Sequence, residues 1–339
     1  MSGFSTSIFV SLAVLLVASC YAQACDDCVP CDLSYCMGRR AAGTCFTATR
    51  QNSQGNTIRN ADCVIVTTDT SIRAIVGTDG VDCVFLDPGS EITRDINTNE
   101  GVDYIIGDSA EVRDIETGAG GDCVYLKNSV VRDIITDTGA DWIKLSSCEA
   151  RNIDSGNGAD CIDILGPEPG KREGSDKRQM SSIIDLIMGG AGADCIKATE
   201  TEFDQASGNG GADHIVMNDV MFNTINGNGG VDNIDICDFE SRSGSINGGN
   251  GNDRITAKGS TQTSLRAPTI NGDNGNDVCC SMDESTNIVC EIEDCGAFQP
   301  SAPSTEPPML TDPPTTDPPM LTDPPTTDPP MMTDPPTTD

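Results

Sequence analysis

The chain has 339 residues, a formal net charge of -33 and 17 cysteines, but only one Trp, four Tyr and eight Phe. So negative a charge argues against nucleic acid and anionic membrane surfaces as partners and favours cations. Because aromatic residues are few, we expect a narrow core of stacked aliphatic side chains rather than a broad globular core.

Residues 1–24 have the features of a secretory signal. An apolar stretch from Ile8 to Ala18 precedes the small-residue pattern Ala22-Gln23-Ala24, which is typical of a cleavage site. No later run approaches the roughly 18 apolar residues that a membrane helix needs. Loss of Cys20 with the signal leaves an even number of cysteines, as expected in an oxidising compartment. The protein is therefore predicted to be secreted, extracellular and not inserted in a membrane.

Residues 25–55 are rich in cysteine. In a cytosolic protein such spacing would indicate zinc, but in an oxidising compartment it favours disulfide bonds. We expect a disulfide-bonded cap over the first repeat. The cysteines of this segment are Cys25, Cys28, Cys31, Cys36 and Cys45.

From residue 56 to 280 an aspartate returns about every nineteen residues, each after a small turn rich in Gly, Asn or Thr. A fixed period near twenty residues indicates a solenoid, in which each repeat forms one rung. We therefore predict an all-β fold, a parallel β-solenoid of about 11 rungs. The turn aspartates are Asp62, Asp82, Asp103, Asp122, Asp141, Asp160, Asp194, Asp213, Asp232, Asp253 and Asp277.

Two columns of aliphatic residues accompany these aspartates, one seven places before and one two places after. Alternate residues of a strand face opposite sides, so both columns are predicted to point inward. The first column is Ile75, Ile96, Ile115, Ile134, Ile153, Ile187, Ile225, Ile246 and Ile270. The second is Val84, Ile105, Val124, Ile143, Ile162, Ile196, Ile215, Ile234 and Ile255.

Three segments depart from the repeat. The polar stretch 167–180 lengthens one rung and is predicted to be an exposed loop. Residues 281–296 contain Cys290 and Cys295 and are expected to form a second cysteine-rich cap. Residues 297–339 repeat an eleven-residue unit rich in Pro, Thr and Asp. Paired prolines forbid helix and sheet, so this segment is predicted to be a low-complexity stalk.

Two turns carry a full nonapeptide, Gly189-Gly-Ala-Gly-Ala-Asp-Cys-Ile-Lys197 and Gly248-Gly-Asn-Gly-Asn-Asp-Arg-Ile-Thr256. Both resemble the GGxGxDxUx motif of RTX-type β-rolls, whose stacked turns bind calcium. Such turns offer backbone carbonyls and carboxylates, the oxygen ligands that Ca²⁺ takes. The resemblance implies calcium ions bound at Asp122, Asp160, Asp194, Asp213, Asp232, Asp253 and Asp277.

The repeat departs from that family, because the motif occurs once in nineteen residues and not every nine. At most one edge of the solenoid could then be lined by ions. The alternative is a metal-free ladder, in which each aspartate accepts hydrogen bonds from neighbouring backbone N–H groups. Pectate-lyase-like β-helices, which the chain resembles more remotely, stack Asn and Asp side chains in that way.

An arginine stands nine residues before the turn aspartate in five rungs. Unpaired, these arginines would repel one another at the spacing of adjacent strands, so the adjacent acids Asp95, Asp114 and Asp133 are expected to pair with them. The alternative is a groove that binds an anionic polysaccharide. The arginines are Arg73, Arg94, Arg113, Arg132 and Arg151.

The residue after each turn aspartate is predicted to face outward, and many of these residues are cysteines. Adjacent rungs bring their Cα atoms within disulfide reach, so the bridges Cys63–Cys83 and Cys161–Cys195 are geometrically allowed. Cys279, Cys280, Cys290 and Cys295 are expected to close the far end. The only histidine, His214, lies in the same outward column, and nothing in the sequence pairs it with a nucleophile.

The sequence thus predicts a secreted, calcium-binding structural protein of a cell wall, extracellular matrix, adhesive or biomineral. Extracellular polysaccharide or a mineral surface is a further candidate partner. The alternative function is a polysaccharide lyase or polysaccharide-binding protein of the parallel β-helix class. No catalytic constellation stands out, so enzymatic activity is not favoured.

Overall fold

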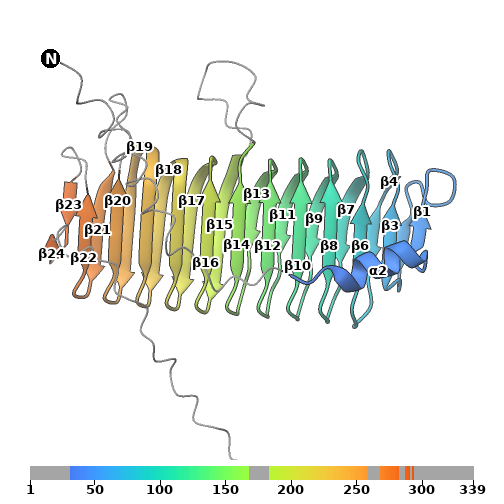
Figure 1. Cartoon of the computed structure of the whole chain (residues 1–339), viewed down its shortest axis with the longest axis horizontal. Coiled ribbons are helices and arrows are strands. Elements are labelled where there is room, and N and C mark those ends of the chain that lie inside the picture. The colour runs from blue at the N-terminus through green and yellow to red at the C-terminus, as the bar shows by residue number, and fades with distance from the viewer. Residues whose placement is uncertain (1–30, 168–182, 259–267, 282–286, 291, 294–339) are drawn as a thin grey trace, which may run out of the picture. The chain divides into compact units, whose positions relative to one another are not determined.

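The computed structural model describes residues 31–167, 183–258, 268–281, 287–290 and 292–293. They belong to one compact unit, Met1–Ala297, and form a parallel β-solenoid with one helix among the described residues (Figure 1). The predicted signal, most of the polar loop and the stalk of residues 297–339 lie outside the described residues.

The helix α2 spans Ser34–Ala42. The strands of the first half are β1 (Phe46–Ala48), β2 (Thr57–Arg59), β3 (Cys63–Val66), β4 (Ser71–Ile72), β5 (Ala74–Val76), β6 (Cys83–Leu86), β7 (Glu91–Asn97), β8 (Tyr104–Asp108), β9 (Glu111–Glu116), β10 (Cys123–Lys127), β11 (Val130–Ile135) and β12 (Trp142–Ser146). Those of the second half are β13 (Glu149–Asp154), β14 (Cys161–Leu165), β15 (Ile183–Ala191), β16 (Cys195–Thr199), β17 (Glu202–Gly210), β18 (His214–Gly229), β19 (Asn233–Asn250), β20 (Arg254–Lys258), β21 (Thr269–Asn274), β22 (Val278–Ser281), β23 (Asn287–Val289) and β24 (Ile292–Glu293).

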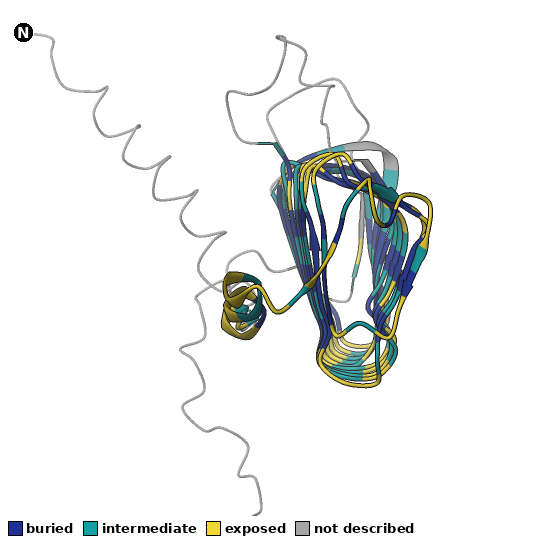
Figure 2. Ribbon diagram, turned by 90° about the vertical axis from the view of Figure 1, so that its right-hand side faces the viewer, coloured by how far each residue is buried: buried dark blue, intermediate teal, exposed yellow. Residues whose placement is uncertain are grey.

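The strands pair in two parallel series, one before and one after the turn aspartate of each rung. The post-turn series runs from β1 through β3, β6, β8, β10, β12, β14, β16, β18, β19, β20 and β22 to β24. The pre-turn series runs from β2 through β5, β7, β9, β11, β13, β15, β17, β18, β19 and β21 to β23. Seen along its length, the solenoid has the two walls formed by these series (Figure 2).

The predicted parallel β-solenoid is therefore confirmed, but the ladder is longer than the repeat pattern indicated. At the N-terminal side β1 pairs with β3, so pairing begins before residue 56. At the other end β23 and β24 continue both series beyond residue 280. These end strands lack the turn motif, which is why the sequence period alone missed them.

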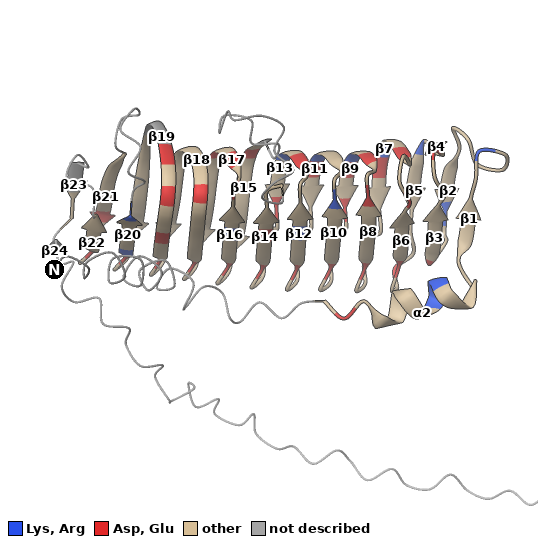
Figure 3. Cartoon of the chain, turned by 45° about the horizontal axis from the view of Figure 1, so that its top comes forward, with Lys and Arg blue, Asp and Glu red and all other residues tan. Residues whose placement is uncertain are grey.

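Residues 31–45 of the cysteine-rich N-terminal segment run along the side of the solenoid. Residues 31–45, here called the strap, lie outside the post-turn wall, and α2 runs beside it (Figures 2 and 3). The strap is bonded to three rungs through Cys45–Cys63, Cys36–Cys83 and Cys31–Cys123. The disulfide bonding expected for this segment is present at Cys31, Cys36 and Cys45, and it joins residues 31–45 to the outward cysteines of the wall.

Apolar packing and charge also hold the strap. Cys36 and the fully buried Phe85 belong to one apolar cluster outside the main core. The Arg40 guanidinium lies 4.9 Å from the centre of the Phe85 ring and 2.6 Å from Asp87. Arg39 pairs with Asp62 at 2.9 Å. The strap therefore covers an apolar patch that the first rungs would otherwise expose.

The allowed bridge between Cys63 and Cys83 does not form. The two residues are neighbours in register, but each is bonded to a strap cysteine instead. Cys161 and Cys195 are also register neighbours, and each is disulfide-bonded. At the far end Cys279–Cys290 confirms part of the expected closure.

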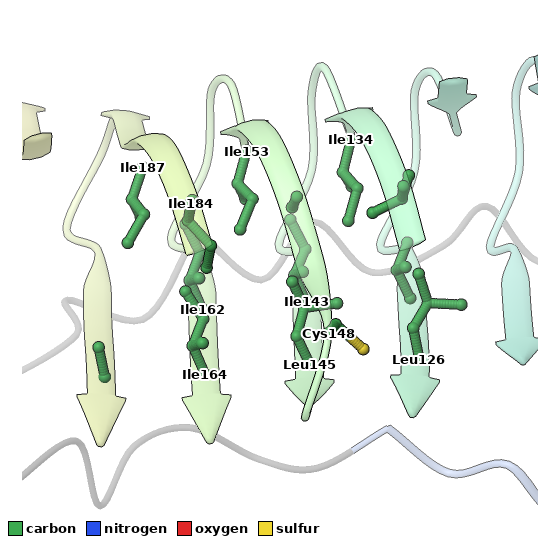
Figure 4. Packing of buried hydrophobic residues seen from close by; sticks show 14 of the residues in the cluster. Leu126, Ile134, Ile143, Leu145, Cys148, Ile153, Ile162, Ile164, Ile184 and Ile187 are labelled. Carbon is green, nitrogen blue, oxygen red and sulfur yellow. The ribbon is translucent and has the colours of Figure 1, made fainter. Parts of the chain in front are cut away.

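Both predicted aliphatic columns lie in the core, and none of their members exposes more than 2 % of its surface. The interior of the middle rungs is filled by such stacked side chains (Figure 4). In the rung of Asp213 the smaller Ala206 takes the place of the isoleucine seven residues before the aspartate, and it is also fully buried. The core is thus a narrow stack, as the shortage of aromatic residues implied.

Glycine two places before the turn aspartate is required by close backbone contact. A Cβ added to Gly139 would lie 1.3 Å from the carbonyl oxygen of Gly120, the equivalent glycine of the adjacent rung. No side-chain rearrangement can relieve that overlap. The glycines of the motif therefore serve the stacking of rungs whether or not a metal is present.

We expect Gly139→Ala to destabilise the solenoid by more than about 2 kcal/mol, because two rungs must separate to admit the methyl group. The matched control is Gly210→Ala, where an added Cβ meets nothing within 4 Å. Urea unfolding followed by circular dichroism measures both. Equal losses of stability in the two variants would contradict this explanation of the motif.

Candidate functional site

The turn aspartates form a buried row inside the solenoid. Ten of them expose at most 3 % of their surface, and Asp62, the first of the series, is outside the row with 60 % of its side chain exposed. Each lies two residues before an inward aliphatic side chain, so strand alternation turns it inward. The row comprises Asp82, Asp103, Asp122, Asp141, Asp160, Asp194, Asp213, Asp232, Asp253 and Asp277.

A continuous chain of hydrogen bonds connects the row. The backbone N–H of each aspartate donates to Oδ1 of the aspartate in the next rung, over nine bonds of 2.7–2.9 Å. For example, the Asp122 N–H donates to Asp141 Oδ1 at 2.7 Å, and the Asp141 N–H donates to Asp160 Oδ1 at 2.9 Å. The bonds pass through every rung of the row.

The reason for these bonds is the position of the aspartate at the start of its post-turn strand. Its carbonyl already belongs to the backbone ladder, since the Trp142 N–H donates to the Asp122 carbonyl at 2.8 Å. A buried backbone N–H without an acceptor is costly. The carboxylate of the next rung supplies that acceptor.

The second carboxylate oxygen, Oδ2, has a different environment. It is buried, and in most of the second half of the row it has no hydrogen-bond partner among the described residues. At the start of the row, Asp82 Oδ2 accepts the Thr78 N–H at 2.8 Å. Oδ2 lacks a partner in Asp194, Asp213, Asp232 and Asp253. In Asp103, Asp122, Asp141 and Asp160 a hydroxyl five residues earlier, that of Thr98, Thr117, Thr136 or Ser155, interacts with the carboxyl and lowers its pKa.

Burial changes the titration of these carboxyls. Removal from water disfavours the ionised form and raises the pKa of an aspartate. It raises the pKa to about 7 for Asp103, Asp141, Asp194 and Asp232. It raises the pKa to about 6 for Asp122, Asp160 and Asp213. The row is thus a set of carboxyls with reduced acidity.

This geometry does not fit a calcium site. Ca²⁺ takes six to eight oxygen ligands, but each rung offers one buried carboxylate whose Oδ1 is already hydrogen-bonded. Turn carbonyls are also engaged, since the Gly120 N–H donates to the Thr138 carbonyl at 2.7 Å and the Gly139 N–H to the Asn157 carbonyl at 2.8 Å. Among the described residues, no group of three or more His, Cys, Asp or Glu could hold a metal ion.

All seven predicted calcium ligands lie in this row, from Asp122 and Asp160 to Asp277. The structure brings them together along a line, but their Oδ1 atoms serve as acceptors for backbone N–H groups. Of the two interpretations that the sequence left open, the metal-free ladder agrees with these contacts. Calcium binding stays a prediction for experiment.

The arginine column is partly an ion ladder. Arg132 contacts both Asp114 and Asp133, at 2.5 and 2.8 Å. Arg113 lies 3.5 Å from Asp114, and Arg151 lies 3.0 Å from Asp133. The expected pairing is thereby confirmed for these three arginines. Within the described ranges the structure shows no ion pair for Arg73 or Arg94, both of which are exposed.

An open groove of about 580 Å³ follows this column along five rungs. Its floor includes Val112, Val131 and Ala150. Val112 and Ala150 each lie between a glutamate and an arginine, whereas Val131 lies between the exposed Val130 and Arg132. The arginines therefore both face a groove and are neutralised by acids. Its charged lining residues are Glu91, Glu111, Arg113, Arg132, Glu149, Arg151 and Asp185.

His214 lies on the outer side of the post-turn wall. Its Nε2 is 3.2 Å from Asn233 Nδ2 and 3.7 Å from Asp235 Oδ2. Its register neighbour Cys195 is disulfide-bonded and so has no thiol to offer as a nucleophile. The surroundings of this histidine are those of a structural polar contact.

Comparisons of the chain with protein-family models, with curated proteins and with solved structures found no match. The choice between calcium binding and a metal-free ladder therefore depends on the contacts around the aspartate row. The position of each aspartate two residues before an inward aliphatic side chain does not separate these interpretations, because the GGxGxDxUx motif places its aspartate in the same way.

We expect Asp141→Ala to destabilise the protein by about 1–3 kcal/mol, because the buried Asp122 N–H loses its acceptor. Asp141→Asn keeps an amide oxygen in that place and is expected to cost much less. The control Asp79→Ala removes an exposed carboxylate of a turn. Chemical denaturation of the three variants provides the comparison, and an Asn variant as unstable as the Ala variant would contradict the ladder.

Proposed function

We propose that this protein has an extracellular structural role, in which the solenoid acts as a stiff, regular rod. The observation that carries the proposal is the unbroken ladder, in which backbone pairing and the aspartate row connect each rung to the next. Each rung contacts mainly its neighbours, so such a fold resists bending and presents one surface pattern along its length. Cell wall, extracellular matrix and adhesive layers are settings that use such rods.

The disulfide bonds support an extracellular setting. Four pairs are seen among the described residues, and three of them attach the strap to the wall. Disulfides persist mainly in oxidising compartments, and the predicted signal of residues 1–24 accords with secretion. The described part of the chain contains no helix with the length and hydropathy needed to cross a membrane.

The structural role is tested against the lyase alternative by incubating the purified protein with polygalacturonate, alginate and chondroitin sulfate. A lyase releases unsaturated uronate ends, which absorb in the ultraviolet. We expect no such product, with or without added calcium, because the groove arginines are already paired with Asp114 and Asp133. Steady product formation above a boiled control would sink the structural proposal.

Calcium dependence has its own test. Because Oδ1 of each row member from Asp103 onward is hydrogen-bonded to backbone, we expect melting in excess EGTA to match melting in calcium. Thermal denaturation of residues 25–296 in non-reducing buffer, followed by far-ultraviolet circular dichroism, compares the two conditions. A large fall in melting temperature on chelation would instead support calcium ions at Asp194, Asp253 and the other predicted ligands.

Polysaccharide binding is the second candidate function, and the groove along the arginine column favours it. An anionic polysaccharide held there should bind more weakly as salt rises and in the variant Arg151→Gln. Arg59→Gln, an exposed arginine that does not line the groove, is the matched control. The measurement is affinity electrophoresis in gels containing alginate or polygalacturonate. Retardation of wild type and Arg59→Gln but less of Arg151→Gln would support binding in the groove, and no retardation of wild type would contradict it.

A further inference from the structure

We propose that protons, and not calcium ions, neutralise the aspartate row, so that part of its carboxyls are protonated when the folded protein is at neutral pH. The row would then be a line of partly protonated carboxyl groups inside the solenoid. This inference concerns the interior of the rod and does not depend on the proposed extracellular role.

The first support is that, among the described residues, the charges acting on the row from Asp103 to Asp253 are those of other acids, and the one cation, Arg39, acts on Asp82. The negative charges of Asp122 and Asp160 raise the pKa of Asp141, and those of Asp213 and Asp253 raise the pKa of Asp232. Acidic residues that are not members of the row also raise the pKa of row members by their charge: Asp137 for Asp122, Asp154 for Asp160 and Asp273 for Asp253. Next to the strap, the charge of Asp62 raises the pKa of Asp82 and the charge of Arg39 lowers it. Adjacent members are spaced by about one strand separation, roughly 4.8 Å, so full ionisation of the row would place like charges in close contact.

The second support is the space around Oδ2. In six rungs a glycine lies five places before the row aspartate, and its Cα packs against this oxygen. A Cβ on Gly208 would lie 2.2 Å from Asp213 Oδ2, and one on Gly227 would lie 2.3 Å from Asp232 Oδ2. A calcium ion and its ligand shell need far more room. A proton needs none, and it leaves Oδ1 in place as the acceptor of the backbone N–H.

The sign of the pH dependence follows from these carboxyls. Their pKa in the unfolded chain is near 3.8, and in the fold it is raised by burial to about 7 for Asp141 and about 6 for Asp213. Between about pH 4 and pH 7 the folded state therefore binds more protons than the unfolded state. Stability then falls as pH rises through this window and levels off above it. Surface carboxyls with lowered pKa, such as Asp62 and Asp133, have the opposite effect on stability. They stabilise the fold when ionised, and this stabilisation is lost only below about pH 4.

General repulsion in so acidic a chain would also weaken with falling pH, and salt separates the two effects. Repulsion among exposed charges is screened at high ionic strength, whereas buried groups are screened much less. The matched pair of variants is Asp141→Asn, in the row, and Asp137→Asn, in the turn of the same rung. Asp137 has a positive φ of 62°, which asparagine tolerates, and both variants remove one carboxyl.

The experiment is urea unfolding of the full chain from pH 4.5 to 8 in EGTA and 1 M NaCl. We expect wild type to lose stability between pH 4.5 and 7, Asp137→Asn to change this slope only slightly through its effect on Asp122, and Asp141→Asn to show a clearly shallower slope. Calorimetric unfolding at pH 6 in buffers of different ionisation enthalpy should release about one proton fewer from Asp141→Asn than from wild type.

A flat or rising profile, or equal slopes in both variants, would overturn the proposal. So would a calcium-induced rise in stability at pH 8 that Asp141→Asn abolishes, since calcium would then occupy the row. If Asp141→Asn fails to fold, Asp213→Asn replaces it. Infrared spectroscopy of wild type supplies an independent reading: the carbonyl band of protonated carboxyl groups should be present in the native state at pH 6.5 and vanish on unfolding.

Discussion

The backbone N–H at each corner of the solenoid is the constraint on which the aspartate row depends. Parallel pairing satisfies the strands, but the N–H of the residue that opens each post-turn strand points along the axis without a backbone acceptor. The carboxylate of the next rung fills this role, as between Asp122 and Asp141. One residue type at one position thus completes the hydrogen bonding of a corner that would otherwise hold an unsatisfied buried donor.

Completing the ladder in this way creates an electrostatic difficulty. A neutral asparagine could accept the same N–H, yet the chain places aspartate in every rung from Asp82 to Asp277. Buried carboxyls of this kind are stable only if something neutralises them or if the charge is tolerated at a cost. The raised pKa of Asp103 and Asp194 indicates that the fold favours the neutral form.

The sequence predicted the rungs, both inward columns and the parallel pairing, because these follow from period and alternation. It could not decide between calcium and a ladder, since Gly-x-Asp turns serve both. The glycine at Gly139 is explained as well by close approach to Gly120 as by a metal loop. The position of the strap could not be predicted from the sequence either. The bond between Cys36 and Cys83 depends on the path of the strap along the wall, which no local sequence pattern indicates.

The strap has a consequence for how such a chain can change in length. A solenoid can grow by duplicating a rung, since each new rung stacks on equivalent neighbours. Between Cys63 and Cys123, however, the strap is fastened at fixed heights by Cys45, Cys36 and Cys31. A rung inserted there would move the anchoring cysteines apart by roughly 4.8 Å while the strap kept its own length. The strap therefore fixes the number of rungs between Cys63 and Cys123.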